Sequence, residues 1–280
     1  MLRFTMNNKS VSIGNTDVLE KSIKFNQTDE EFIIDCLKKL DKLHTIIDFF
    51  KISEYNFYQF FSQFDIKSNG SIVLNNENKS EEFIILNSLL ISYLASSRTL
   101  IDLLQSFDKK NSMDRHFNNT YDNNFYYQLM YTLRNFALHG HIPIYFDGRR
   151  YSFNLEYILK EGEHFNFNKS AKNSLEKIKK IIFEEQLNIA NIDFYTAITE
   201  YHRSLLMLIK LFFEEYRIIF KEQFTKYKEL LKKFKSNNDL LYLYLNKEVH
   251  SVQTIDMVKW INSLYDYIQK SLSFFDQQFS

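Results

Sequence analysis

The chain has 280 residues, enough to bury a substantial core in one large domain or in two small ones. Its 35 lysines and arginines balance 35 aspartates and glutamates, and this zero net charge argues against a protein that coats nucleic acid through a basic surface. With only one cysteine, Cys36, the chain can form no internal disulfide and offers no cysteine-based zinc site. A lone cysteine fits the reducing cytoplasm, where we expect the protein to reside.

Long helices dominate the expected secondary structure, because five glycines and one proline leave few positions that break a helix. Apolar residues recur at helical spacing in seven segments. In chain order, these predicted helices cover residues 28–50, 54–64, 80–107, 121–138, 170–186, 196–234 and 254–275. At about 1.5 Å per residue the helix over 196–234 would be roughly 58 Å long, so we expect it either to bend or to extend into a partner.

Short strands are expected between the helices. Residues 142–146 and 151–155 flank an Asp-Gly pair that favours a tight hairpin turn. Another strand is expected at 71–74, and a further hairpin around Gly14. The sequence therefore predicts an all-α helical bundle with a small β-hairpin insertion and a long C-terminal helix.

The domain organisation and the relation to membranes follow from the same pattern. Residues 1–75 can be an N-terminal helical extension to a main domain at 76–280, or residues 1–280 can form a single domain, since no biased linker forces a split. No run approaches the roughly 18 uncharged apolar residues of a membrane helix. Residues 1–5 lack the apolar stretch of a signal peptide, so we expect no membrane association.

One predicted helix end carries the residues best suited to chemistry. Arg134, Asn135 and His139 lie there. Gly140 and Pro143 follow, and both residue types are typical of helix ends. Asn135 and His139 are four residues apart and share a helix face. Arg134 and His139 are five apart, about 140° around the helix at about 100° per residue, so they converge only where the last turn is distorted or the arginine bends over it.

These residue types suit RNA cleavage by the neighbouring ribose hydroxyl. A histidine can take the 2′-hydroxyl proton or protonate the leaving oxygen near neutral pH. An arginine can hold the phosphate and stabilise its developing charge. The nucleophile belongs to the substrate, so neither a metal nor another cofactor is expected. The same residues also fit an ordinary helix end, with His139 near the negative end of the helix dipole and Arg134 paired with an acid.

The stretch from Arg134 to His139 resembles the signature of the HEPN family, in which an arginine is followed by a polar residue and, some positions later, by a histidine. Two flanking segments add to the likeness. Residues 140–144 are similar to the short exit with Pro-Ile in bacterial HEPN proteins, and residues 94–102 resemble the small-residue-rich first core helix. The likeness covers about residues 80–160.

The resemblance implies a HEPN-like bundle and a metal-independent endoribonuclease with Arg134 and His139 as the catalytic pair and Asn135 as a polar helper. It also implies a homodimer in which two motifs face one cleft. A role as a toxin or an antiviral, abortive-infection effector follows from the family, with an antitoxin or other regulatory protein as restraint. Some toxin members carry a tyrosine two residues after the histidine, where a partner enzyme modifies them. Here that residue is His141, which argues against this mode of control.

Several other residues are weaker candidates. His141 fits either a second acid or base or a loop histidine. Arg98 and Asp102, four apart on the predicted helix 80–107, can orient the site or form an ordinary ion pair. Candidates for RNA contact, which fit a solvated surface as well, are the cations Lys109, Lys110, Arg115, Arg149 and Arg150.

Two other functions fit the same sequence. One is a non-catalytic HEPN-like module that binds RNA, a nucleotide or a protein partner and uses the motif structurally. The other is a helical interaction protein whose predicted helix at 196–234 serves as a dimerisation arm. The remaining histidines are too scattered along the chain to indicate a metal site.

Overall fold

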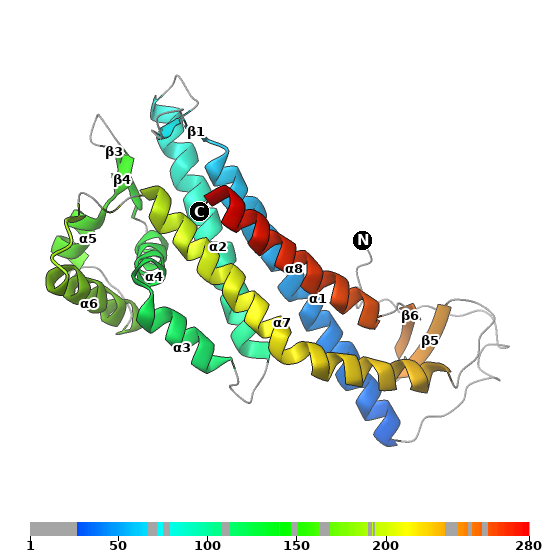
Figure 1. The fold of residues 1–280 in the computed structure, drawn as a ribbon. Coiled ribbons are helices and arrows are strands. Elements are labelled where there is room, and N and C mark those ends of the chain that lie inside the picture. The colour runs from blue at the N-terminus through cyan, green and yellow to red at the C-terminus, as the bar shows by residue number, and fades with distance from the viewer. Residues whose placement is uncertain are drawn as a thin grey trace. The chain divides into compact units, whose positions relative to one another are not determined.

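The computed structural model describes residues 27–66, 72–74, 79–107, 113–139, 141–146, 151–162, 169–189, 192, 194–232, 240–245, 248–253 and 257–279. This part of the chain is all-α with small β-hairpins, as the sequence predicts (Figure 1). Its helices are α1 (Gln27–Phe61), α2 (Lys79–Phe107), α3 (Asp114–Asn123), α4 (Phe125–Leu138), α5 (Leu155–Glu161), α6 (Lys169–Glu184), α7 (Phe194–Lys232) and α8 (Met257–Phe279).

Among the described residues, the strands form three separate antiparallel hairpins. They are β1 (Phe64–Ile66) with β2 (Ile72–Leu74), β3 (Ile144–Phe146) with β4 (Tyr151–Phe153), and β5 (Leu240–Leu245) with β6 (Glu248–Gln253). The first two hairpins contain the strands predicted at 71–74, 142–146 and 151–155, whereas β5 and β6 were not predicted. The hairpin expected around Gly14 lies outside the described residues.

The chain divides into two compact units, each built from segments distant in sequence. The smaller unit contains α1 up to His44 and the chain from Phe212 to Lys270. The larger unit runs from Thr45 to Leu211 and is completed by the end of α8. Neither unit corresponds to residues 1–75 or 76–280, and that division stays a prediction.

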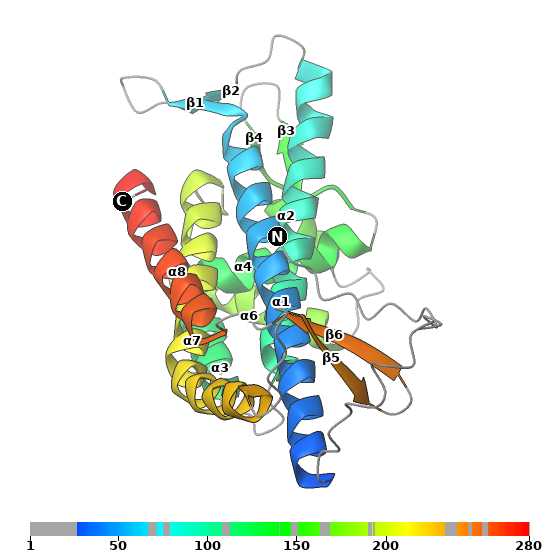
Figure 2. The same cartoon turned by 90° about the vertical axis from the view of Figure 1, so that its right-hand side faces the viewer.

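Helix α1 corrects the prediction of two N-terminal helices. The prediction of separate helices at 28–50 and 54–64 was wrong, because α1 is one helix of 35 residues. Ser53 and Glu54 interrupt the apolar pattern of the sequence, yet both are buried. The Ser53 and Ser97 hydroxyls hydrogen-bond at 2.9 Å, which satisfies this polar position within the core. Figure 2 shows α1 and α2 side by side.

A second correction concerns the helix predicted over 121–138. The chain instead breaks at Asn124, whose extended backbone separates α3 from α4. The Asn124 side chain accepts a hydrogen bond from the Tyr127 N–H at 2.9 Å and so caps the start of α4. By contrast, the long helix predicted over 196–234 is confirmed by α7, which has 39 residues.

An aromatic core surrounds His202 in the larger unit. The imidazole stacks on the Phe57 ring with centroids 3.8 Å apart, and the Tyr93 hydroxyl lies 3.0 Å from its Nδ1 atom. Phe275 of α8 lies 5.3 Å away, centroid to centroid. Residues of α1, α2, α7 and α8 therefore meet at this histidine.

Helix α2 is apolar along much of its length. Its segment Glu81–Phe107 is the one stretch in the described part of the chain that is long and apolar enough to cross a membrane. Half of its most apolar window is buried inside the protein, and core helices of soluble proteins have the same length and composition.

Candidate functional site

Helix α4 carries the arginine–histidine motif at its C-terminal end. The backbone stays α-helical to Leu138, and His139 is the C-cap residue, with φ −90° and ψ 16°. The Phe136 carbonyl accepts hydrogen bonds from the His139 N–H at 3.2 Å and from the His141 N–H at 3.4 Å. These two bonds close the end of the helix. Because the backbone is helical up to Leu138, the side chains at 134 and 139 point to different sides of α4, about 140° apart at the ideal 100° per residue.

The structure brings Arg134 and Asn135 into contact. The Arg134 Nη1 donates to the Asn135 Oδ1 at 3.3 Å. Asn135 is 6 % exposed, whereas Arg134 is half-buried and His139 is exposed. The Arg134 Nε and the Asn135 Nδ2 are buried donors, and neither finds an acceptor among the described residues. A buried N–H group without a partner is costly, and an acceptor from a ligand or from an ordered water would remove that cost.

Arg98 and Asp102 of α2 border this pair. The Arg98 Nη2 lies 2.7 Å from the Asp102 Oδ1, and the Arg98 guanidinium sits over the Tyr131 ring, 5.4 Å from its centroid. Burial, and secondly the positive charge of Arg98, lowers the pKa of Arg134. Two guanidinium groups therefore lie close enough to repel each other. Arg98 and Asp102 thus form the ion pair that their spacing allows, and a role for them in orienting the motif stays a prediction.

Tyrosines from α4 and α7 form the inner boundary of the site. Tyr127 and Tyr201 are both buried, with ring centroids 5.4 Å apart. Burial raises the pKa of Tyr201, and the charges of Arg98 and Arg134 partly oppose that shift. Neither tyrosine was among the candidates predicted from the sequence. The spacing of Tyr127, Tyr131 and Arg134 places them on one helix face and would have indicated the first two, but Tyr201 is distant in sequence.

The segment that follows His139 is anchored to α2. The Asn87 side chain accepts from the Ile144 N–H at 2.9 Å and donates to the Ile144 carbonyl at 3.4 Å. His141 stacks on Phe136, with centroids 4.6 Å apart and planes inclined by 16°. These contacts fix the path of the chain on either side of Pro143. His141 therefore packs against the end of α4 and is half-buried.

The cationic residues predicted to contact RNA add little to the description of the site. Arg115 is exposed in the first turn of α3. Lys109, Lys110, Arg149 and Arg150 lie outside the described residues. Within the part of the chain that the structure describes, no group of three or more histidine, cysteine, aspartate or glutamate residues could hold a metal ion.

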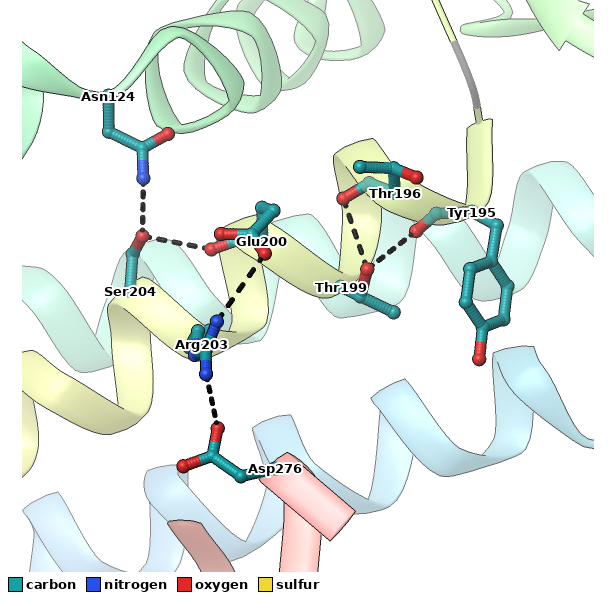
Figure 3. A network of polar contacts seen from close by, with 8 residues as sticks. All are labelled: Asn124, Tyr195, Thr196, Thr199, Glu200, Arg203, Ser204 and Asp276. Atoms are coloured by element: carbon teal, nitrogen blue, oxygen red, sulfur yellow. Dashed lines mark hydrogen bonds and ion pairs between the residues drawn. The ribbon is translucent and has the colours of Figure 1, made fainter. Parts of the chain in front are cut away.

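A separate polar network holds α7 within the larger unit (Figure 3). Asn124 donates from its Nδ2 to the Ser204 Oγ at 2.9 Å, so the residue that caps α4 is also tied to α7. On the same helix, the Arg203 Nη2 lies 2.8 Å from Asp276 of α8 and its Nη1 lies 3.7 Å from Glu200. Arg203 is two residues from Tyr201, about 200° around the helix, so the two side chains leave α7 on different sides.

Comparison of the chain with protein-family models, with curated proteins and with solved structures gives no match in any of the three. The motif at the end of α4 and the groups that surround it are therefore the features that can indicate a function.

Proposed function

We propose that this protein is a HEPN-type, metal-independent endoribonuclease. The observation that carries the proposal is the Arg134–Asn135 pair, whose buried N–H groups lack acceptors among the described residues, at a helix end that also presents the exposed His139. A guanidinium and an amide suit the oxygens of a phosphodiester, and an accessible imidazole suits proton transfer.

The proposed reaction is an attack of the ribose 2′-oxygen on the adjacent phosphorus. The His139 imidazole takes the 2′-hydroxyl proton as the O2′–P bond forms, and the P–O5′ bond breaks as the leaving oxygen receives a proton from the imidazolium so formed. Arg134, assisted by Asn135, stabilises the charge that develops on the non-bridging oxygens. The products are a 2′,3′-cyclic phosphate and a 5′-hydroxyl, and no metal or cofactor takes part.

The biological setting that we propose follows from the family resemblance. A homodimeric, cytoplasmic ribonuclease with no recognisable sequence-reading element would cut many cellular RNAs. Such an enzyme requires a restraint, and an antitoxin or other regulatory protein would provide it. We therefore propose a toxin or an antiviral, abortive-infection effector with RNA as its substrate.

Cleavage of end-labelled RNA in the presence of EDTA tests the proposed reaction. We expect wild type to produce 2′,3′-cyclic phosphate ends with the chelator present. Arg134→Ala and His139→Ala should each reduce the cleavage rate by about 100-fold or more, because each removes a group that acts on the transition state. His116→Ala on α3 is the matched histidine control and should cleave like wild type. A strict requirement for Mg²⁺, or products that end in a 3′-hydroxyl, would contradict the mechanism.

A non-catalytic HEPN-like module that binds RNA, a nucleotide or a protein partner is the second candidate. One observation favours it: α4 stays helical to Leu138, and at about 100° per residue this directs Arg134 and His139 to different sides of the helix. In that case wild type and His139→Ala would bind RNA equally well, and neither would cleave it. The same purified proteins, assayed for binding and for cleavage, separate the two candidates.

A further inference from the structure

The charges around Arg134 do not balance. Arg98 is paired with the Asp102 carboxylate at 2.7 Å and is further held over the Tyr131 ring. Arg134 donates only to the neutral amide oxygen of Asn135, and no carboxylate of the described residues forms an ion pair with it. The contact between α2 and α4 therefore holds two guanidinium groups and one carboxylate. A half-buried cation without a counter-charge is costly, and the charge of Arg98 adds repulsion.

The hydrogen-bonding groups of Arg134 and Asn135 also contain more donors than acceptors. The Arg134 Nε and the Asn135 Nδ2 are buried donors that lack acceptors among the described residues. The Asn135 oxygen already accepts from Arg134, so the group left over is its N–H₂. A ligand that satisfies both atoms must supply acceptors, and one that also relieves the repulsion must be negative. An oxyanion meets both requirements, whereas a neutral or cationic ligand does not.

We propose that Arg98 is a second substrate-binding arginine, and that it holds the scissile phosphodiester of RNA together with Arg134 and Asn135. Asp102 and Tyr131 act as positioning residues, because they fix the Arg98 guanidinium from its edge and from its face. The Arg98 side chain is 25 % exposed, so a ligand can reach it from the surface. This inference rests on the proposed ribonuclease function and adds to it the residue that completes the phosphate site.

Equilibrium binding of an uncleavable RNA tests the role of Arg98 apart from catalysis. The probe is a fluorescein-labelled, single-stranded 2′-fluoro RNA, which lacks the nucleophilic hydroxyl, and its binding is followed by anisotropy over a range of NaCl concentrations. The variants are Arg98→Met and Arg98→Lys. Arg203→Met is the matched control, since Arg203 also pairs with an aspartate, at 2.8 Å, in the same compact unit.

We expect Arg98→Met to weaken binding about 10-fold, because it removes a charge-assisted contact to phosphate. The slope of log Kd against log salt should also fall by about 0.7, the value for one phosphate contact on a single strand. Arg98→Lys should keep the salt slope but lose affinity, because an ammonium group cannot bind bidentately. Arg203→Met should keep both. A purely structural role for Arg98 would not change the salt slope.

The outcomes distinguish this inference from the ribonuclease proposal. Wild-type affinity and salt slope in a well-folded Arg98→Met variant, with RNA cleavage by wild type intact, would overturn the role of Arg98 and leave the ribonuclease. An Arg98-dependent salt slope without cleavage would support the phosphate site and remove the ribonuclease. Binding of inorganic phosphate without any binding of the RNA probe would overturn the assignment to RNA. Melting curves of Arg98→Met and Arg98→Lys show whether each variant is folded.

Discussion

His202 shows how strongly a single position can depend on its surroundings. The imidazole is 1 % exposed, and burial lowers its pKa to about 3 from an ordinary value near 6.5. Its Nδ1 faces the Tyr93 hydroxyl, its face lies on Phe57, and its Nε2 has no hydrogen-bond partner among the described residues. The folded protein therefore holds this histidine in its neutral form.

This neutral histidine predicts a stability that declines in acid. Between about pH 6.5 and pH 3 the unfolded chain protonates His202 and the folded protein does not, so unfolding takes up a proton. The contribution of His202 is fully present above pH 6.5 and is lost as the pH falls toward 3, by at most about 1.4 kcal/mol per pH unit. Urea unfolding of wild type and His202→Gln from pH 7 to pH 5 measures it. Equal pH slopes for the two proteins would show that His202 contributes nothing.

At the residue scale, the sequence could indicate the candidate site only where its residues are neighbours in the chain. The motif residues lie within one and a half helical turns, so their spacing alone predicted that they belong to one helix end. They are Arg134, Asn135 and His139. The four-residue spacing of Arg98 and Asp102 also predicted that they share a helix face. Their position beside Arg134, and that of Tyr201, depends on the packing of α2 and α7 against α4, which no local pattern encodes.

At the scale of elements, Asn124 decides where α4 begins. Its Oδ1 caps the helix through the Tyr127 N–H, and its Nδ2 reaches Ser204 on α7. We expect Asn124→Ala to lower the free energy of unfolding by about 1–2 kcal/mol, the sum of a lost cap and a lost hydrogen bond. Asn124→Asp should lose less, because it still caps. The midpoint of urea unfolding measures both, with Asn123→Ala, an exposed residue at the end of α3, as the control.

The outcome of Asn123→Ala decides how the Asn124 result is interpreted. An equal loss in Asn123→Ala and Asn124→Ala would mean that the Asn124 cap is not what sets the stability of this segment, since alanine itself favours helix more than asparagine does. A loss confined to Asn124→Ala would confirm that the break between α3 and α4 is specified by one side chain. The sequence-based expectation of one helix over 121–138 missed this break because asparagine inside an apolar periodic pattern is only a weak signal.

The remaining elements differ in how clearly the sequence marks them. The long α7 was predictable because its apolar stripe is continuous from Tyr201 to Leu230, and the β3–β4 hairpin because an Asp-Gly pair separates its strands. The β5–β6 hairpin was missed although leucine and tyrosine alternate in the first of its strands. In α1, a polar but buried Ser53 concealed the continuity of the helix.

At the scale of the whole molecule, the two compact units could not be foreseen. Their boundaries fall inside α1, α7 and α8, where the periodicity of the sequence continues without a linker. If each domain is assumed to be one continuous segment of the chain, the sequence suggests a division such as 1–75 and 76–280. Units assembled from distant segments depend on long-range packing, which composition and spacing do not report.

The divergence of Arg134 and His139 makes a prediction about assembly. Within one chain the two side chains leave α4 about 140° apart. In a closed two-fold dimer the same surface of two chains meets face to face, so Arg134 of each protomer can stand opposite His139 of the other. We expect a homodimer at micromolar concentration, by light scattering, with two such composite sites.

Complementation between two inactive chains tests this arrangement. Arg134→Ala and His139→Ala carry different affinity tags, are co-expressed, and the mixed dimer is isolated through both tags. If the sites are composite, one site of each mixed dimer keeps both Arg134 and His139 while the other site lacks both, so we expect about half of the wild-type cleavage rate. Dimers of either variant alone are the controls and should be inactive. If the pair acts within one chain, the mixed dimer contains no intact site and stays inactive, and a monomer that cleaves RNA would contradict the dimer altogether.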